Sequence, residues 1–85
     1  MAARPVVTLY SRDGCGLCDE ALHYLREFAS RLGFDIAVVD ITTDDELHRR
    51  YMFEIPVITL EGREIARAPI YKTKLHDQLT EALHR

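Results

Sequence analysis

The chain has 85 residues, of which 47% are hydrophobic and 29% are charged, proportions that suit one small globular domain with a modest core. The formal net charge of -3 excludes a general electrostatic attraction to nucleic acid or to anionic lipid. No apolar run approaches transmembrane length, and residues 1–5 contain no stretch apolar enough for a signal peptide. We therefore expect residues 1–85 to form a single cytoplasmic domain with no nucleic-acid or membrane partner.

The first half of the chain predicts a strand, a helix and a second strand. Residues 6–10 are an apolar, strand-like run, and residues 11–14 predict a turn. A helix is predicted over residues 17–32, with Gly33 placed to end it. Residues 34–41 are rich in β-branched side chains and predict the second strand. The apolar positions that recur at helical spacings are Leu17, Ala21, Leu25, Phe28 and Leu32.

The second half predicts a short helix, a hairpin and a closing helix. Thr43 and Glu46 have the spacing of a capping box, so a short helix is expected to begin there and run to about Tyr51. The remaining expected elements are a strand over residues 55–60 with a proline near its start, a tight turn at Glu61-Gly62, a returning strand over residues 63–67 and a helix over residues 72–83.

The predicted order of elements is therefore β-α-β-α-β-β-α. The first two strands flank a helix, so they should lie parallel and be joined by a right-handed crossover. The last two strands should form an antiparallel hairpin. The sequence thus predicts an α/β fold, a three-layer sandwich in which a four-stranded mixed sheet has helices on both faces.

A Cys-Gly-Leu-Cys motif at residues 15–18 separates the first strand from the first helix. This position places the thiol of Cys15 near the helix N-terminus, where unpaired backbone N–H groups and the helix dipole stabilise a thiolate. The thiol of Cys18 lies one turn along, close enough to close a small disulfide. Because the chain has no second Cys pair, the motif predicts a dithiol redox site rather than a complete zinc site.

Three features together resemble the thioredoxin superfamily: the element order, the Cys-x-x-Cys at the start of the first helix, and Ile55-Pro56 at the start of the third strand. Within that superfamily the chain is similar to the small glutaredoxin-like proteins. The matching pattern is Leu-Tyr-Ser-Arg at residues 9–12, followed by Cys-Gly-Leu-Cys-Asp-Glu-Ala at residues 15–21. The resemblance covers essentially the whole chain and implies a thioredoxin-like sandwich.

The resemblance also implies roles for individual residues. Cys15 would be the attacking thiol and Cys18 the resolving thiol. Pro56 matches the superfamily's cis-proline, and a cis bond there would expose the backbone of Ile55 to a substrate peptide or to glutathione. Arg12 would supply the positive charge that many glutaredoxins carry shortly before the motif.

The chain departs from the glutaredoxin pattern at two places. Gly16 stands where dithiol glutaredoxins usually have proline, and residues 65–69 lack the Gly-Gly-acid pattern that binds glutathione. Arg67 lies in that stretch, so we consider it a substitute that would pair with a substrate carboxylate. Tyr10 and Tyr71 either border the site or simply pack at the core or rim.

These residues predict a thiol–disulfide oxidoreductase that reduces protein or glutathione mixed disulfides. Its electron donor would be glutathione or a reductase, and we expect a monomer with no metal and no tightly bound cofactor. Two alternatives stay open. Gly16 resembles the Cys-Gly-x-Ser sites of monothiol glutaredoxins that bind an iron–sulfur cluster, which favours a cluster-carrying or electron-delivery module. The Cys pair could also serve a binding domain that senses redox state without turnover.

Overall fold

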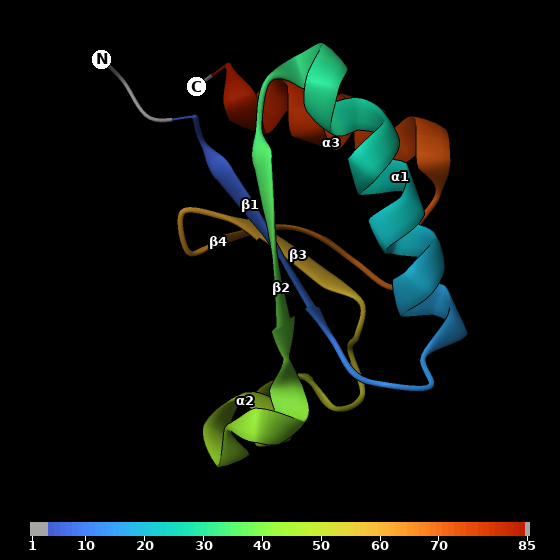
Figure 1. Cartoon of the computed structure of the whole chain (residues 1–85), viewed down its shortest axis with the longest axis vertical. Coiled ribbons are helices and arrows are strands. Elements are labelled where there is room, and N and C mark those ends of the chain that lie inside the picture. The colour runs from blue at the N-terminus through green and yellow to red at the C-terminus, as the bar shows by residue number, and fades with distance from the viewer. Residues whose placement is uncertain (1–3, 85) are drawn as a thin grey trace.

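The computed structural model describes residues 4–84, and its elements follow the predicted order (Figure 1). They are β1 (Val6–Ser11), α1 (Gly16–Leu32), β2 (Asp35–Asp40), a short 3-10 helix η1 (Ile41–Thr43), α2 (Asp45–Tyr51), β3 (Val57–Leu60), β4 (Arg63–Arg67) and α3 (Lys72–Leu83).

The strands form one mixed sheet in the order β2-β1-β3-β4. Strand β1 runs parallel to β2 and antiparallel to β3, so that Tyr10 lies opposite both Val39 and Val57. The β3–β4 hairpin turns at Glu61 and Gly62, whose φ values of 52° and 81° are those of a tight hairpin turn. The predicted four-stranded mixed sheet is confirmed.

The core lies between one face of this sheet and the two long helices, α1 and α3 (Figure 1). Its largest fully buried side chains include Leu9 on β1, Leu25 on α1, Ile58 on β3 and Leu79 on α3. Because side chains alternate along a strand, Tyr10 points to the opposite face. There its ring packs on Tyr51 at the end of α2, with 4.8 Å between ring centroids, so α2 covers one end of that face.

The buried stripe of α1 differs from the predicted one at its first position. Leu17 was expected to face the core, but it is 59% exposed. The first turn instead buries Cys18, and the stripe continues through Ala21 and Leu25. Successive helical residues are about 100° apart around the axis, so turning Cys18 inward turns Leu17 away from the core.

The start of α2 also differs from the prediction. Its N-cap is Asp44, whose Oδ1 accepts hydrogen bonds from the backbone N–H groups of Glu46 (2.9 Å) and Leu47 (3.1 Å). The Thr43–Glu46 capping box is therefore wrong. Thr43 ends η1, and its hydroxyl donates to the carbonyl of Asp40 at 2.8 Å. Because Thr43 belongs to the preceding 3-10 helix η1, it does not serve as the N-cap of α2.

The end of α1 is as predicted. Gly33 adopts a left-handed conformation with φ of 80°, and its N–H donates to the Ala29 carbonyl at 2.9 Å. Glycine meets little steric cost in this conformation. Across residues 4–84, no helix is both long enough and apolar enough to cross a membrane.

Candidate dithiol site

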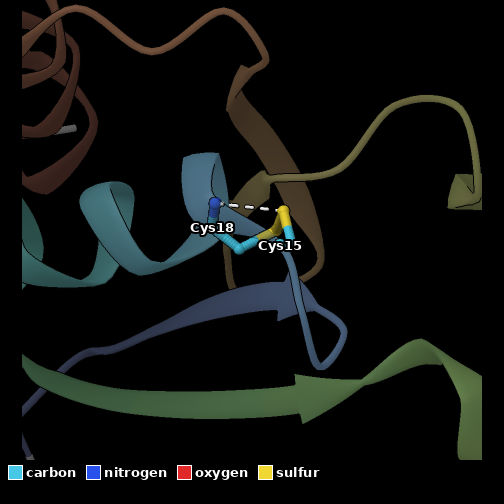
Figure 2. The surroundings of a disulfide bond; sticks show 2 residues. All are labelled: Cys15 and Cys18. Atoms are coloured by element: carbon cyan, nitrogen blue, oxygen red, sulfur yellow. Dashed lines mark hydrogen bonds between the residues drawn. A yellow bond between two sulfur atoms is a disulfide. The ribbon is translucent and has the colours of Figure 1, made fainter.

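The two cysteines lie where the turn after β1 becomes α1. Cys15 is the N-cap of α1, in extended conformation with φ of -99° and ψ of 99°, and Cys18 lies in the first turn. Their Cα atoms are 5.2 Å apart and their sulfurs form a disulfide bond (Figure 2). The predicted placement of both thiols at the helix N-terminus is confirmed.

The two sulfurs have different surroundings. Cys18 is only 2% exposed, whereas Cys15 is partly exposed. The backbone N–H of Cys18 donates to Sγ of Cys15 at 3.1 Å (Figure 2). A donor at the helix N-terminus stabilises negative charge on the sulfur that accepts it. After reduction, Cys15 would therefore be both the accessible sulfur and the one with the better-stabilised thiolate.

The loop that enters β3 lies on one side of the disulfide. Because Val57 pairs with Tyr10, Pro56 lies at the same end of the sheet as the turn that carries Cys15, and Figure 2 shows this loop passing the disulfide. The Ile55–Pro56 bond is cis, as the resemblance implies. The Ala68–Pro69 bond is also cis, a feature that was not predicted.

Much of the backbone of this loop is already hydrogen-bonded within the chain. The N–H of Ile55 donates to the Tyr51 carbonyl at 3.1 Å, and the carbonyl of Pro56 accepts from the N–H of Ala68 at 2.9 Å. We expected the backbone of Ile55 to be open to a substrate strand. Its donor is instead occupied by a hydrogen bond of the helical i→i−4 kind to Tyr51, the last residue of α2.

Arg67 is also occupied. Its Nε and Nη2 donate to the two carboxylate oxygens of Glu64 at 2.6 and 2.8 Å, and its Nη1 donates to Glu54 at 3.0 Å. The pKa of Arg67 is raised by these carboxylates, Glu64 first, so the guanidinium stays charged and compensated. The prediction that Arg67 awaits a substrate carboxylate is not supported, because two acids of the chain already take that place. We call the loop at residues 54–56 together with Arg67 and Ala68 the proline side.

A cleft of about 480 Å³ opens on the other side of the disulfide, toward β2. Cys18 lines it, together with the apolar side chains of Leu9, Leu22 and Val38. Its charged lining residues are Arg12, Asp13, Asp19 and Asp40, so we call it the acidic cleft. This cleft could not be predicted from local sequence patterns, because its walls come from three separate segments. The predicted parallel pairing of β1 with β2 was the one available signal.

Arg12 and Tyr10 occupy different faces of this end of the molecule. Arg12 lines the acidic cleft, and its charge helps to lower the pKa of Asp40, after the two hydrogen bonds that this carboxylate accepts from Thr42. Tyr10 faces away from the core and packs on Tyr51. Tyr71, immediately before α3, is 62% exposed. Of the predicted site residues, Arg12 shares the acidic cleft with Cys18, whereas Tyr10 lies on the opposite face of the sheet.

The described residues give little support to a metal site. Within residues 4–84 there is no group of three or more His, Cys, Asp or Glu side chains placed to hold a metal ion.

At Gly16, an added Cβ would meet no atom within 4 Å. Packing in this structure therefore does not demand glycine between the cysteines.

Comparison with known proteins agrees with this geometry. A family model described as a glutaredoxin-like domain (DUF836) matches residues 6–82. Uncharacterized proteins of Mycobacterium tuberculosis and Mycobacterium bovis are 36% identical over 67 residues, which cover 73% of this chain and 69% of theirs. The sequence-based resemblance is confirmed.

Solved structures show the same fold. A structural-genomics target protein of X. campestris is 34% identical, with a TM-score of 0.74 over 88% of this chain and 96% of its own. Thioredoxin 1 of Thermosipho africanus is 18% identical, with a TM-score of 0.68 over 93% of this chain and 94% of its own, and at that identity it supports the fold alone. The chain therefore belongs to the glutaredoxin-like domain family, and it carries a redox-type Cys-x-x-Cys pair.

Proposed function

We propose that this protein is a thiol–disulfide oxidoreductase that uses Cys15 and Cys18 to reduce disulfides of other molecules. The observation that carries the proposal is the asymmetry of the pair. Cys15 is partly exposed and accepts a backbone N–H bond at the start of α1, while Cys18 is buried within bonding distance of it. An accessible stabilised thiolate backed by a second thiol is what thiol–disulfide exchange needs.

The reaction proceeds in two exchanges. The Cys15 thiolate attacks one sulfur of a substrate disulfide, forming a mixed disulfide and releasing the other sulfur as a thiolate. Cys18 loses its proton to solvent and attacks Sγ of Cys15, which closes the Cys15–Cys18 disulfide and releases the second substrate thiolate. Two electrons pass from the dithiol to the substrate, and the released thiolates take up protons from water.

The substrate in this proposal is a protein disulfide or a glutathione mixed disulfide. The backbone of Ile55 next to Pro56 would contact the substrate chain through its carbonyl, since its N–H is occupied. Glutathione or a reductase would return electrons to the oxidised pair. The setting we propose is the cytoplasm, where closely spaced cysteines serve redox chemistry more often than structure, and we propose a monomer without a tightly bound cofactor.

Mass spectrometry of the protein equilibrated in glutathione redox buffers tests this proposal. Free thiols are alkylated before analysis. We expect a loss of two hydrogens that maps to Cys15 and Cys18 and titrates between oxidising and reducing buffers. A persistent glutathione adduct on Cys15 would indicate a monothiol mechanism. Thiols that stay fully alkylatable across the whole range would contradict the proposal and favour the cluster-binding alternative.

A kinetic assay separates the enzyme from the redox-sensing alternative. An enzyme reduces a small uncharged disulfide, such as bis(2-hydroxyethyl) disulfide, with many turnovers when glutathione or a reductase regenerates the dithiol. A redox-sensing domain would form the Cys15–Cys18 disulfide reversibly but would show no turnover above the uncatalysed rate.

A further inference from the structure

The acidic cleft reaches the dithiol motif at Cys18. Cys18 forms part of its wall, whereas neither Cys15 nor Pro56 does. Its volume of about 480 Å³ lies within the usual range of ligand-binding clefts, roughly 300–1,000 Å³. A substrate held on Cys15 as a mixed disulfide therefore brings the residues that flank its own cysteine to the mouth of this cleft.

The apolar part of the acidic cleft can receive a hydrophobic side chain. Leu9 is 1% exposed and forms its floor with Leu22, while Val38 on the edge strand β2 is 51% exposed. An apolar side chain that covers Val38 removes its surface from water, which favours association. This surface alone does not identify the occupant.

The charges of the acidic cleft do identify it. Three aspartates stand against one arginine in the lining, a formal excess of two negative charges. The salt bridges of residues 4–84 engage neither Asp13 nor Asp19. The third carboxylate, Asp40, accepts hydrogen bonds from Thr42, which lower its pKa further. The complementary occupant carries lysine or arginine.

On the proline side, Arg67 offers little uncompensated charge to an anion. Arg67 donates to Glu54 and to Glu64, so two acids compensate this one cation. Glutathione has more carboxylates than ammonium groups and is a net anion at neutral pH. It therefore meets repulsion from the acidic cleft and a compensated arginine on the proline side.

We propose that the acidic cleft is a substrate subsite that binds a basic segment of a protein next to its reactive cysteine. An apolar residue of that segment lies on Leu9, Leu22 and Val38, and a lysine or arginine reaches Asp13 and Asp19. The site consequently reduces disulfides in cationic protein segments faster than anionic disulfides such as glutathione mixed disulfides. This inference rests on the proposed oxidoreductase function and names its substrate class.

Three disulfide substrates test the inference with the full-length protein. Two are synthetic peptides in which the cysteine is followed by Leu-Lys-Lys or by Leu-Glu-Glu, each as a mixed disulfide with 2-mercaptoethanol. The third is bis(2-hydroxyethyl) disulfide, which is uncharged and reports the intrinsic reactivity of the pair. At low salt we expect kcat/KM for the lysine peptide to exceed that for the glutamate peptide by about ten-fold. The ratio should shrink at high ionic strength, since salt screens exposed charges.

A matched pair of variants locates the preference. Asp13→Asn/Asp19→Asn removes two negative charges from the acidic cleft. Asp45→Asn/Glu46→Gln removes two negative charges from exposed positions in the first turn of α2. Rates are expressed relative to the uncharged disulfide, which cancels any change in thiolate reactivity. We expect the cleft variant to reduce the lysine-to-glutamate ratio to about two-fold or less and the α2 variant to keep it.

The possible outcomes separate the two levels of the proposal. Equal kcat/KM values for the two peptides with the unmodified protein would overturn the subsite while the oxidoreductase function stands. An equal loss of the lysine preference in both variants would do the same. Absence of turnover with all three disulfides, including the uncharged one, overturns the proposed function and the inference with it. A preference that the cleft variant alone abolishes supports the subsite.

Discussion

On the proline side of the disulfide, the chain's own bonds occupy the Ile55 N–H and the Arg67 guanidinium, whereas two aspartates of the acidic cleft on the other side have no salt bridge within residues 4–84. Ile55 donates its N–H to Tyr51, and Arg67 donates to Glu54 and Glu64. In the acidic cleft, Asp13 and Asp19 form none of the salt bridges found in residues 4–84.

This difference shows where selectivity can arise in a small domain. Groups already bonded within the chain must break those bonds before they bind a substrate, so they add little net affinity. Charges without a partner in the chain break no internal bond when they bind a ligand. They can also discriminate between ligands by the sign of the ligand's charge. We infer that the proline side chiefly shapes the approach to Cys15 and that the acidic cleft discriminates among substrates.

Replacing each cysteine in turn should have the largest effect on the rate of disulfide exchange. It also tests whether Cys15, which lies between the proline side and the acidic cleft, is the attacking thiol. Cys15→Ser should reduce exchange to the uncatalysed rate, because a serine hydroxyl is not a nucleophile toward sulfur at neutral pH. Cys18→Ser should instead trap a mixed disulfide at Cys15, since the resolving thiol is gone. Mass spectrometry of each variant after exposure to the lysine peptide disulfide measures both results.

The roles of the cysteines would be reversed if Cys18 trapped the peptide in the Cys15→Ser protein. If Cys18→Ala kept full dithiol activity, Cys18 would not be the resolving thiol, and its assigned role would be wrong. A mixed disulfide on Cys18 would also mean that this buried residue becomes accessible to a substrate.

Shortening the floor of the acidic cleft should destabilise the protein, whereas shortening its outer wall should not. Leu9 is 1% exposed and belongs to the core, so Leu9→Ala should lower the free energy of unfolding by about 2–5 kcal/mol. Val38 is 51% exposed on an edge strand, so Val38→Ala should cost less than about 1 kcal/mol. Urea unfolding of both variants measures the difference. Equal losses would mean that the cleft is not built on the core.

Removing Arg67 should have a small effect on activity. Arg67→Gln should change kcat/KM for a glutathione mixed disulfide by less than about two-fold, because the guanidinium already binds two carboxylates and is not free for a third. Arg26→Gln, on the exposed side of α1, is the control for the lost charge. A large loss of this activity in the Arg67 variant alone would show that the proline side does bind an anionic substrate.

Much of this site could be predicted from the sequence. The Cys-x-x-Cys pattern between a strand and a helix depends on local bonding, so the position of Cys15 at the N-terminus of α1 followed directly. The fold followed from periodicity and from the order of elements. These features are set by residues close together in the chain.

The remaining features depend on contacts that no local pattern encodes. Arg67 pairs with Glu54, thirteen residues away, so its availability could not be judged from its own segment. The acidic cleft joins Asp13 to Asp40 across the parallel pairing of β1 and β2. The prediction that Leu17 faces the core was wrong for a simpler reason. Both Leu17 and Cys18 satisfy a helical spacing, and only packing selects the one that is buried.

The smallest expected effect concerns the charge of Asp40 in the acidic cleft. Its pKa is lowered first by the hydrogen bond from the Thr42 hydroxyl at 2.7 Å, next by the Thr42 N–H at 2.9 Å, and finally by the charge of Arg12. Thr42→Val removes the first of these, so the pKa of Asp40 should rise toward the ordinary value of about 3.9. Thr43→Val is the control, because its hydroxyl donates to the backbone carbonyl of Asp40 and not to the carboxylate.

A carboxyl group with a lowered pKa stabilises the folded protein above its unfolded pKa and ceases to do so as the pH falls through its folded pKa. The Thr42 variant should therefore be slightly less stable than the unmodified protein at neutral pH and equally stable in acid. A carbon-detected NMR titration of the Asp40 carboxyl, combined with urea unfolding at both pH values, measures this. If Asp40 titrated at the same pH in all three proteins, the Thr42 hydroxyl would not be what lowers its pKa.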